Sequence, residues 1–115
     1  MNPAKEKGDR NEDRVIAAVG QLKALNTWIL GVRRATEEED HEGVDVVVTT
    51  DQGDIYIQVK SSHKQAQKFR HRQRHGERDS NIWCVVAEPT LGGFMAKLHK
   101  TLKFKYEELC RSGFD

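Results

Sequence analysis

Cysteine is scarce in this chain, which limits the covalent and metal-linked frameworks that it can build. Only two cysteines occur among its 115 residues, Cys84 in an apolar run and Cys110 in a helix-like run. Neither has a second thiol or a histidine at the spacing of zinc ligands. We therefore expect two free thiols that are buried or half-buried, as unpaired cysteines usually are.

Long apolar runs are also missing. No stretch approaches the roughly 20 apolar residues that cross a bilayer, and no signal peptide precedes the domain. We therefore expect a cytoplasmic protein without a membrane partner. The chain also lacks an internal repeat, a low-complexity tract and a domain linker. Its length suits a single domain with a real core, so residues 1–115 are expected to form one domain.

A surplus of one charge is missing as well, although the charges are unevenly distributed. Nineteen Lys and Arg residues nearly balance 18 Asp and Glu residues, so net charge indicates no partner. Residues 63–78 nevertheless contain six Lys and Arg and three His against Glu77 alone, whereas residues 37–42 are almost entirely acidic. The basic segment is either the solvated face of a helix or a surface for phosphate groups.

Apolar periodicity and turn residues predict a series of regular elements. A helix from near Asp9 to about Leu25 is followed by a strand over 27–32 and an acidic loop over 37–42. The later elements are strands over 43–48 and 55–62, a basic helix over 63–75, a strand over 81–87, a Gly92-Gly93 loop and a helix over 97–110. The α-β-β-β-α-β-α order predicts an α/β fold, a mixed sheet of about four strands flanked by helices on both faces.

The strands over 43–48 and 55–62 are expected to form a hairpin that gathers polar side chains. Pairing Asp45 with Gln58 leaves a four-residue loop over 50–53, which is an ordinary hairpin connection. Because side chains alternate along a strand, Gln58 and Lys60 then share one face.

These groups suit a magnesium-dependent phosphodiesterase. Mg²⁺ prefers oxygen ligands and keeps several waters, so the Asp45 carboxylate, the Gln58 side-chain oxygen and the Val59 carbonyl form a sufficient set. Lys60 projects to the same side, where an ammonium orients a water or stabilises phosphate charge. The alternative is a salt bridge between Asp45 and Lys60 at a sheet edge, with Gln58 exposed to solvent.

Glu12 is a further acidic candidate, on the first helix. It continues the stripe of Ile16 and Val19 toward the helix start, at the edge of the face that packs on the sheet. It is also the third residue after Asp9 in a capping-box pattern. A capping role and a catalytic role are both open, and the two are compatible.

Three short motifs in this order resemble the PD-(D/E)xK nuclease superfamily. They are Gly8-x-x-x-Glu12-x-x-Val15, Gly43-x-Asp45 and Gln58-x-Lys60-Ser61. The family pattern is an acid on the first helix, an aspartate opening the second strand and an acid-x-lysine on the third. The compact Asp-to-Lys spacing is similar to that of small Holliday junction resolvases, and Gln-x-Lys resembles the Mrr-like restriction endonucleases.

The resemblance implies a restriction-endonuclease-like core and a Mg²⁺- or Mn²⁺-dependent endonuclease that hydrolyses DNA, with branched or structured DNA as one substrate class. It makes Asp45 a metal ligand and Gln58 the third-strand ligand, with the Val59 carbonyl beside them. Lys60 becomes the catalytic lysine, and Glu12 the helix acid and a further ligand.

The nuclease interpretation assigns the basic segment to DNA. The residues expected to contact nucleic acid are Lys64, Lys68, Arg70, Arg72, Arg74, Ser61 and Ser62. A homodimer is expected by analogy, because a small nuclease must engage two strands. Two alternatives stay open: a catalytically degenerate nucleic-acid-binding module, since Gln58 stands where an acid is usual, and a domain whose basic helix meets an acidic protein.

Overall fold

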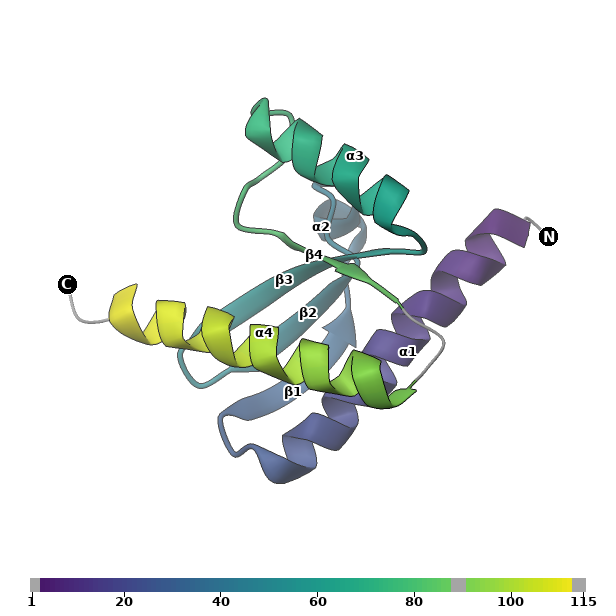
Figure 1. Ribbon diagram of the computed structural model, residues 1–115. Helices are drawn as coiled ribbons and strands as arrows, with labels where there is room; N and C mark the ends of the chain where they lie inside the picture. The colour runs from purple at the N-terminus through teal and green to yellow at the C-terminus, as the bar shows by residue number, and fades with distance from the viewer. Residues whose placement is uncertain (1–2, 88–90, 113–115) are drawn as a thin grey trace.

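The computed structural model describes residues 3–87 and 91–112, which form four helices and one four-stranded sheet (Figure 1). In chain order these are α1 (Pro3–Leu25), β1 (Ile29–Arg34), α2 (Glu37–His41), β2 (Val46–Thr50), β3 (Gly53–Lys60), α3 (His63–Arg74), β4 (Trp83–Val86) and α4 (Leu91–Ser112). The strand order is β1-β2-β3-β4; the first three strands are antiparallel and β4 runs parallel to β3. The predicted α/β fold with a mixed sheet of four strands is confirmed.

Helices cover both faces of the sheet because its strands direct apolar side chains alternately to each side. On one face, α1 and α4 bury Val15 and Leu98 in the same cluster as Ile57 of β3. On the other face, Phe69 of α3 packs in a second cluster with Val47 of β2. The prediction of helices on both faces is therefore also confirmed.

Both cysteines are free thiols, as expected. Cys84 is buried and Cys110 is half-buried. Within residues 3–87 and 91–112, no helix is both long enough and apolar enough to cross a membrane.

The first helix begins earlier than predicted. α1 starts at Pro3, so Asp9 and Glu12 lie inside the helix and the predicted capping box is wrong. Proline is well tolerated in a first turn, where its missing N–H leaves no hydrogen bond unmade. The alanine and the charged residues that follow it are good helix formers, and they extend the helix beyond the apolar stripe.

The acidic segment is a helix rather than the predicted loop. α2 follows Thr36, whose hydroxyl accepts a hydrogen bond from the Glu39 N–H (3.2 Å). The Glu39 carboxylate accepts one in return from the Thr36 N–H (2.9 Å), which completes a capping box. Acidic side chains in the first turn also favour the helix through its dipole.

The last helix begins at Leu91, so the predicted loop at Gly92-Gly93 is wrong, and so is the predicted helix start at residue 97. Phe94 and Leu98 are buried on the sheet, 3% and 1% exposed. This tertiary packing stabilises the helix although glycine has a low intrinsic helix propensity.

The register of the β2–β3 hairpin agrees with the prediction, whereas its turn is tighter. Val47 pairs with Tyr56, as expected. Thr50 also pairs with Gly53, so only residues 51–52 connect the strands instead of the predicted four. Gly53 has a φ of +136°, a backbone conformation that favours glycine and permits the short turn.

Candidate functional site

The hairpin places Asp45, Gln58 and Lys60 at one end of the sheet, on the face covered by α3. Asp45 lies one residue before β2, and its N–H donates a hydrogen bond to the Ile57 carbonyl (2.8 Å). Continuing the register from the Val46–Ile57 pair puts Asp45 opposite Gln58. Gln58 and Lys60 then share the face of Asp45 by strand alternation.

The Asp45 carboxylate is held against the backbone of β3. Its Oδ2 accepts a hydrogen bond from the Val59 N–H at 2.8 Å. Burial raises the pKa of this carboxyl, the Val59 hydrogen bond opposes the rise, and the nearby Asp40 carboxylate adds to it. A cation placed between the two carboxylates would remove their repulsion and favour the ionised form of Asp45.

The Val59 carbonyl points in the same direction as the Val59 N–H. The N–H and C=O of one strand residue lie on the same side, so this carbonyl is directed toward Asp45. The Val59 carbonyl is therefore on the side of β3 that faces Asp45, and its role as a metal ligand stays a prediction.

Gln58 is buried, with 8% of its surface exposed. Among the described residues its amide makes no hydrogen bond, yet no fully enclosed polar side-chain atom lacks a partner. The Gln58 amide therefore opens into the pocket that it lines. An amide that opens into a small pocket offers its oxygen to a cation bound there.

Lys60 is half-buried and lies above the Phe69 ring, with its Nζ 5.8 Å from the ring centroid. It forms no ion pair with a described acidic residue. The alternative of an edge salt bridge between Asp45 and Lys60 with an exposed Gln58 is therefore not what the structure shows.

These groups share one small pocket of about 130 Å³. It is lined by Asp40, Gly43, Asp45, Gln58, Lys60, Phe69, Arg72 and Arg78. The Arg78 guanidinium donates a hydrogen bond to the His41 carbonyl (2.9 Å), which links the segment after α3 to α2. The pocket thus combines two carboxylates, one amide and three cationic side chains.

Four of the lining residues were not predicted as site residues: Asp40, Gly43, Phe69 and Arg78. Gly43 appears in the sequence motif, and its φ of +100° explains why glycine stands there. A Cβ at this position would also lie 3.2 Å from the Phe69 ring. Phe69 and Arg78 reach the pocket only because α3 docks on the sheet, and no local pattern signals that.

Glu12 lies outside this pocket. Its carboxylate is 3.5 Å from the Arg34 guanidinium, which also contacts Asp13. Arg34 ends β1 and pairs with Val46, so Glu12 is at the same end of the sheet, on a helix that packs on the opposite face. The structure brings Asp45, Gln58 and Lys60 together and leaves Glu12 apart.

A divalent metal would find a modest set of protein ligands here. No group of three or more His, Cys, Asp or Glu residues within the described ranges is arranged to hold a metal ion. The oxygens of Asp45, Asp40, Gln58 and the Val59 carbonyl nevertheless suit Mg²⁺ or Mn²⁺, which prefer oxygen and retain several waters.

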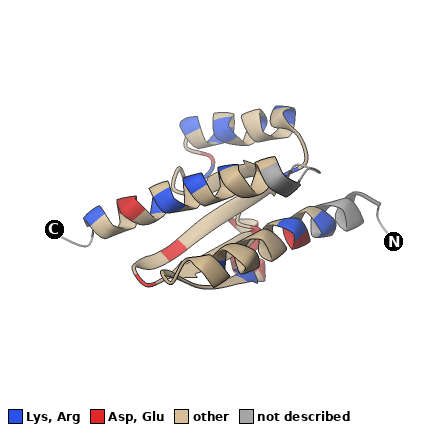
Figure 2. Ribbon diagram, turned by 60° about the horizontal axis from the view of Figure 1, so that its bottom comes forward, with Lys and Arg blue, Asp and Glu red and all other residues tan. Residues whose placement is uncertain are grey.

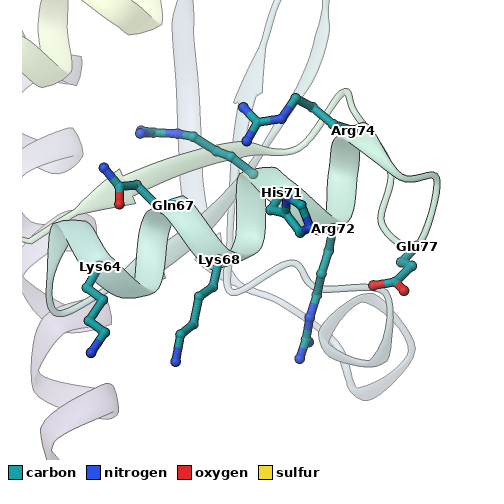
Figure 3. A pocket seen from close by; sticks show the side chains of 8 residues that line it. Lys64, Gln67, Lys68, His71, Arg72, Arg74 and Glu77 are labelled. Atoms are coloured by element: carbon teal, nitrogen blue, oxygen red, sulfur yellow. The ribbon is translucent and has the colours of Figure 1, made fainter.

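The cations of α3 continue directly from this pocket. Lys64, Lys68 and Arg72 are spaced one helical turn apart and point the same way from α3 (Figure 3). Lys60, Lys68 and Arg72 line an adjoining depression of about 250 Å³. Figure 2 shows that Lys and Arg recur along both α3 and α4.

The other predicted nucleic-acid contacts have structural partners or lie on a different side of α3. Ser62 caps α3 by accepting a hydrogen bond from the Gln65 N–H (3.3 Å), and the Ser61 hydroxyl donates to the Gln65 side chain (3.0 Å). Arg70 donates to the Cys84 carbonyl (3.3 Å). Arg74 lies on the side of the helix away from Lys64 (Figure 3).

Comparisons of the chain with protein-family models, with curated proteins and with solved structures found no match. A functional assignment therefore depends on the geometry of the pocket and of α3.

Proposed function

We propose that this protein is a Mg²⁺- or Mn²⁺-dependent endonuclease that hydrolyses DNA phosphodiester bonds, with a restriction-endonuclease-like core of the PD-(D/E)xK type. One observation supports this most: Asp45, the Gln58 amide and the Lys60 ammonium line one pocket, and Lys60 forms no ion pair with a described acid. That pocket adjoins a row of cations on α3, which suits a polyanionic substrate.

The proposed metal ligands are Asp45, Gln58 and the Val59 carbonyl. Asp40 lies close enough to Asp45 to contribute a further oxygen. A bound Mg²⁺ or Mn²⁺ would polarise the phosphate and lower the pKa of the attacking water. Glu12 is given no ligand role, because its carboxylate faces Arg34 instead.

Lys60 and Arg72 are the proposed phosphate contacts. Lys60 would orient the attacking water or stabilise the negative charge that develops on the phosphate. The pocket partly excludes solvent, which strengthens this electrostatic interaction. Arg72 lines both the pocket and the adjoining depression, so it is placed to hold the phosphate that enters from α3.

The test is cleavage of duplex, branched and single-stranded DNA by purified protein with Mg²⁺ or Mn²⁺. Asp45→Ala and Lys60→Ala should each lower the cleavage rate by about 100-fold or more, with unchanged circular dichroism. Asp54→Ala and Lys23→Ala are matched controls at exposed positions and should cut like the wild type. Absence of cleavage on every one of these substrates would contradict the proposal.

A second candidate is a nucleic-acid-binding module that has lost cleavage. The specific observation in its favour is the neutral Gln58, which leaves Asp45 and Asp40 as the pocket's only described carboxylates. It predicts salt-sensitive DNA binding without cutting in any metal. A protein-interaction domain predicts instead no DNA binding at physiological salt.

A homodimer is part of the nuclease proposal, because cutting two strands requires two sites. Sedimentation with and without duplex DNA tests it. A protein that stays monomeric in both conditions and still cuts both strands contradicts this part alone.

A further inference from the structure

A second groove lies at the free edge of β4, between α3 and α4. It has a volume of about 290 Å³ and is separate from the Asp45 pocket. Its walls include Trp83 and Val86 of β4, Arg70 of α3, and Phe94 and Lys100 of α4. In the described sheet β4 has a strand neighbour only in β3, so this edge is open.

The groove combines an aromatic wall with cations. Trp83 is half-buried, while Arg70 and Lys100 are exposed. His63 and Lys97 also line the groove, and none of its described lining residues is acidic. An indole face beside cationic groups is the arrangement that stacks a base and holds the phosphates on either side of it.

The groove is continuous with the basic surface of α3. Arg70 lines the groove and also lines the large depression along α3 with Lys64, Lys68 and Arg74 (Figure 3). Among the described residues that line these two surfaces, Glu77 is the only acidic one, so a strand of nucleic acid that passes from one surface to the other meets mainly cationic side chains.

Two observations favour nucleic acid over an acidic peptide that adds a strand to β4. The Cys84 carbonyl already accepts a hydrogen bond from Arg70, at 3.3 Å. β4 also spans only four residues, Trp83–Val86, and short edge strands make poor templates for strand addition.

We propose that this groove binds single-stranded DNA, with an unpaired base stacked on Trp83 and the flanking phosphates at Arg70 and Lys100. The inference rests on the proposed function in taking nucleic acid as the ligand. It deepens that function by naming DNA with unpaired nucleotides, such as a branch or flap, as the substrate class.

The experiment measures only the binding of oligo(dT), and it uses the Asp45→Ala protein without metal. A Trp28→Phe change leaves Trp83 as the only tryptophan, and oligo(dT) should then quench its fluorescence.

Lys100→Glu should weaken oligo(dT) binding by about five-fold or more. Lys103→Glu changes an exposed lysine of the same helix outside the groove, and it should alter the affinity less than about two-fold. Trp83→Leu should weaken binding of a labelled oligo(dT) by about five-fold or more, measured by anisotropy.

Three results would overturn the groove proposal: no quenching, equal effects of Lys100→Glu and Lys103→Glu, or equal quenching by polyglutamate of matched charge. The last result would identify the groove as a site for acidic peptide. Cleavage is not read here, so a protein that binds oligo(dT) and never cuts still supports the groove while refuting the nuclease.

Discussion

Gln58 is the side chain on which metal affinity should depend most, because it supplies an amide where a third carboxylate would fit. Its position is buried and directly opposite Asp45 by the hairpin register. An amide oxygen binds Mg²⁺ more weakly than a carboxylate, since it carries no net charge. The amide at this position also spares the folded protein a buried acid beside the half-buried Asp45 and the exposed Asp40.

Gln58→Glu should therefore tighten Mn²⁺ binding by about tenfold, or about 1.4 kcal/mol. Without metal the same variant should be less stable than the wild type, because a negative charge is added at a buried position close to the carboxylates of Asp40 and Asp45. Titration calorimetry and thermal unfolding in chelator measure the two effects. Gln52→Glu, in the exposed hairpin turn, is the control. An unchanged Mn²⁺ affinity in Gln58→Glu would count against a metal site here.

The free energy of unfolding should depend on pH through Asp45, and the environment of this carboxyl determines whether stability rises or falls with pH. Burial raises its pKa in the folded protein above that of the unfolded chain. The unfolded chain therefore loses this proton first, and the stabilisation present at low pH is lost as pH rises through the folded pKa. An asparagine at this position avoids that loss and keeps an oxygen for the Val59 N–H.

Asp45→Asn should accordingly be more stable than the wild type at about pH 7, with the difference shrinking toward about pH 3.5, below the ordinary aspartate pKa. Urea unfolding at both pH values in chelator measures it. Asp54→Asn, exposed on the same hairpin, is the control and should show no such trend. A difference that grows as the pH falls would contradict the assigned direction.

The sequence predicts part of the site because the relation between Asp45, Gln58 and Lys60 is local. A hairpin register and the alternation of a strand are enough to put the three on one face. Phe69 and Arg78 enter the pocket through the docking of α3, which depends on long-range packing that no short pattern encodes.

At the scale of elements, α2 decides where Asp40 lies. Its acidic composition predicts a loop, yet the capping box of Thr36 and Glu39 closes a short helix. Glu39 also pairs with Arg33 of β1 at 2.7 Å, and these hydrogen bonds hold its pKa at about 2. The strands and α3 follow from periodicity, whereas α2 and the start of α4 depend on a cap and on tertiary packing.

Thr36→Ala should destabilise the protein by about 1 kcal/mol, the usual loss for an N-cap hydroxyl. It should also weaken Mn²⁺ binding, since α2 no longer holds Asp40 beside Asp45. Urea unfolding and titration calorimetry measure the two effects. Glu38→Ala, an exposed position whose side chain takes no part in the cap, is the matched control. If Thr36→Ala loses stability and binds Mn²⁺ like the control, Asp40 has no role at the site.

At the scale of the whole molecule, one face of the sheet carries the larger apolar cluster and the other carries the candidate site. The larger apolar cluster joins α1 and α4 to one face, whereas α3 on the other face covers the Asp45 pocket and carries the cations. Charge on α3 can therefore be altered while the larger cluster stays intact. The net charge of +1 conceals this separation, because acids elsewhere in the chain balance the cations of α3.

The row on α3 predicts how DNA binding responds to salt. Each phosphate neutralised by a cation contributes about 0.9 to the slope of log affinity against log salt concentration. Changing Lys64, Lys68 and Arg72 together to glutamine should therefore lower that slope by roughly 2 to 3. A triple variant with the same change of charge at the exposed Lys23, Lys103 and Arg111 should keep the wild-type slope. Anisotropy titrations of labelled DNA over a salt series separate the two, and equal slopes would show that net charge, rather than α3, attracts the DNA.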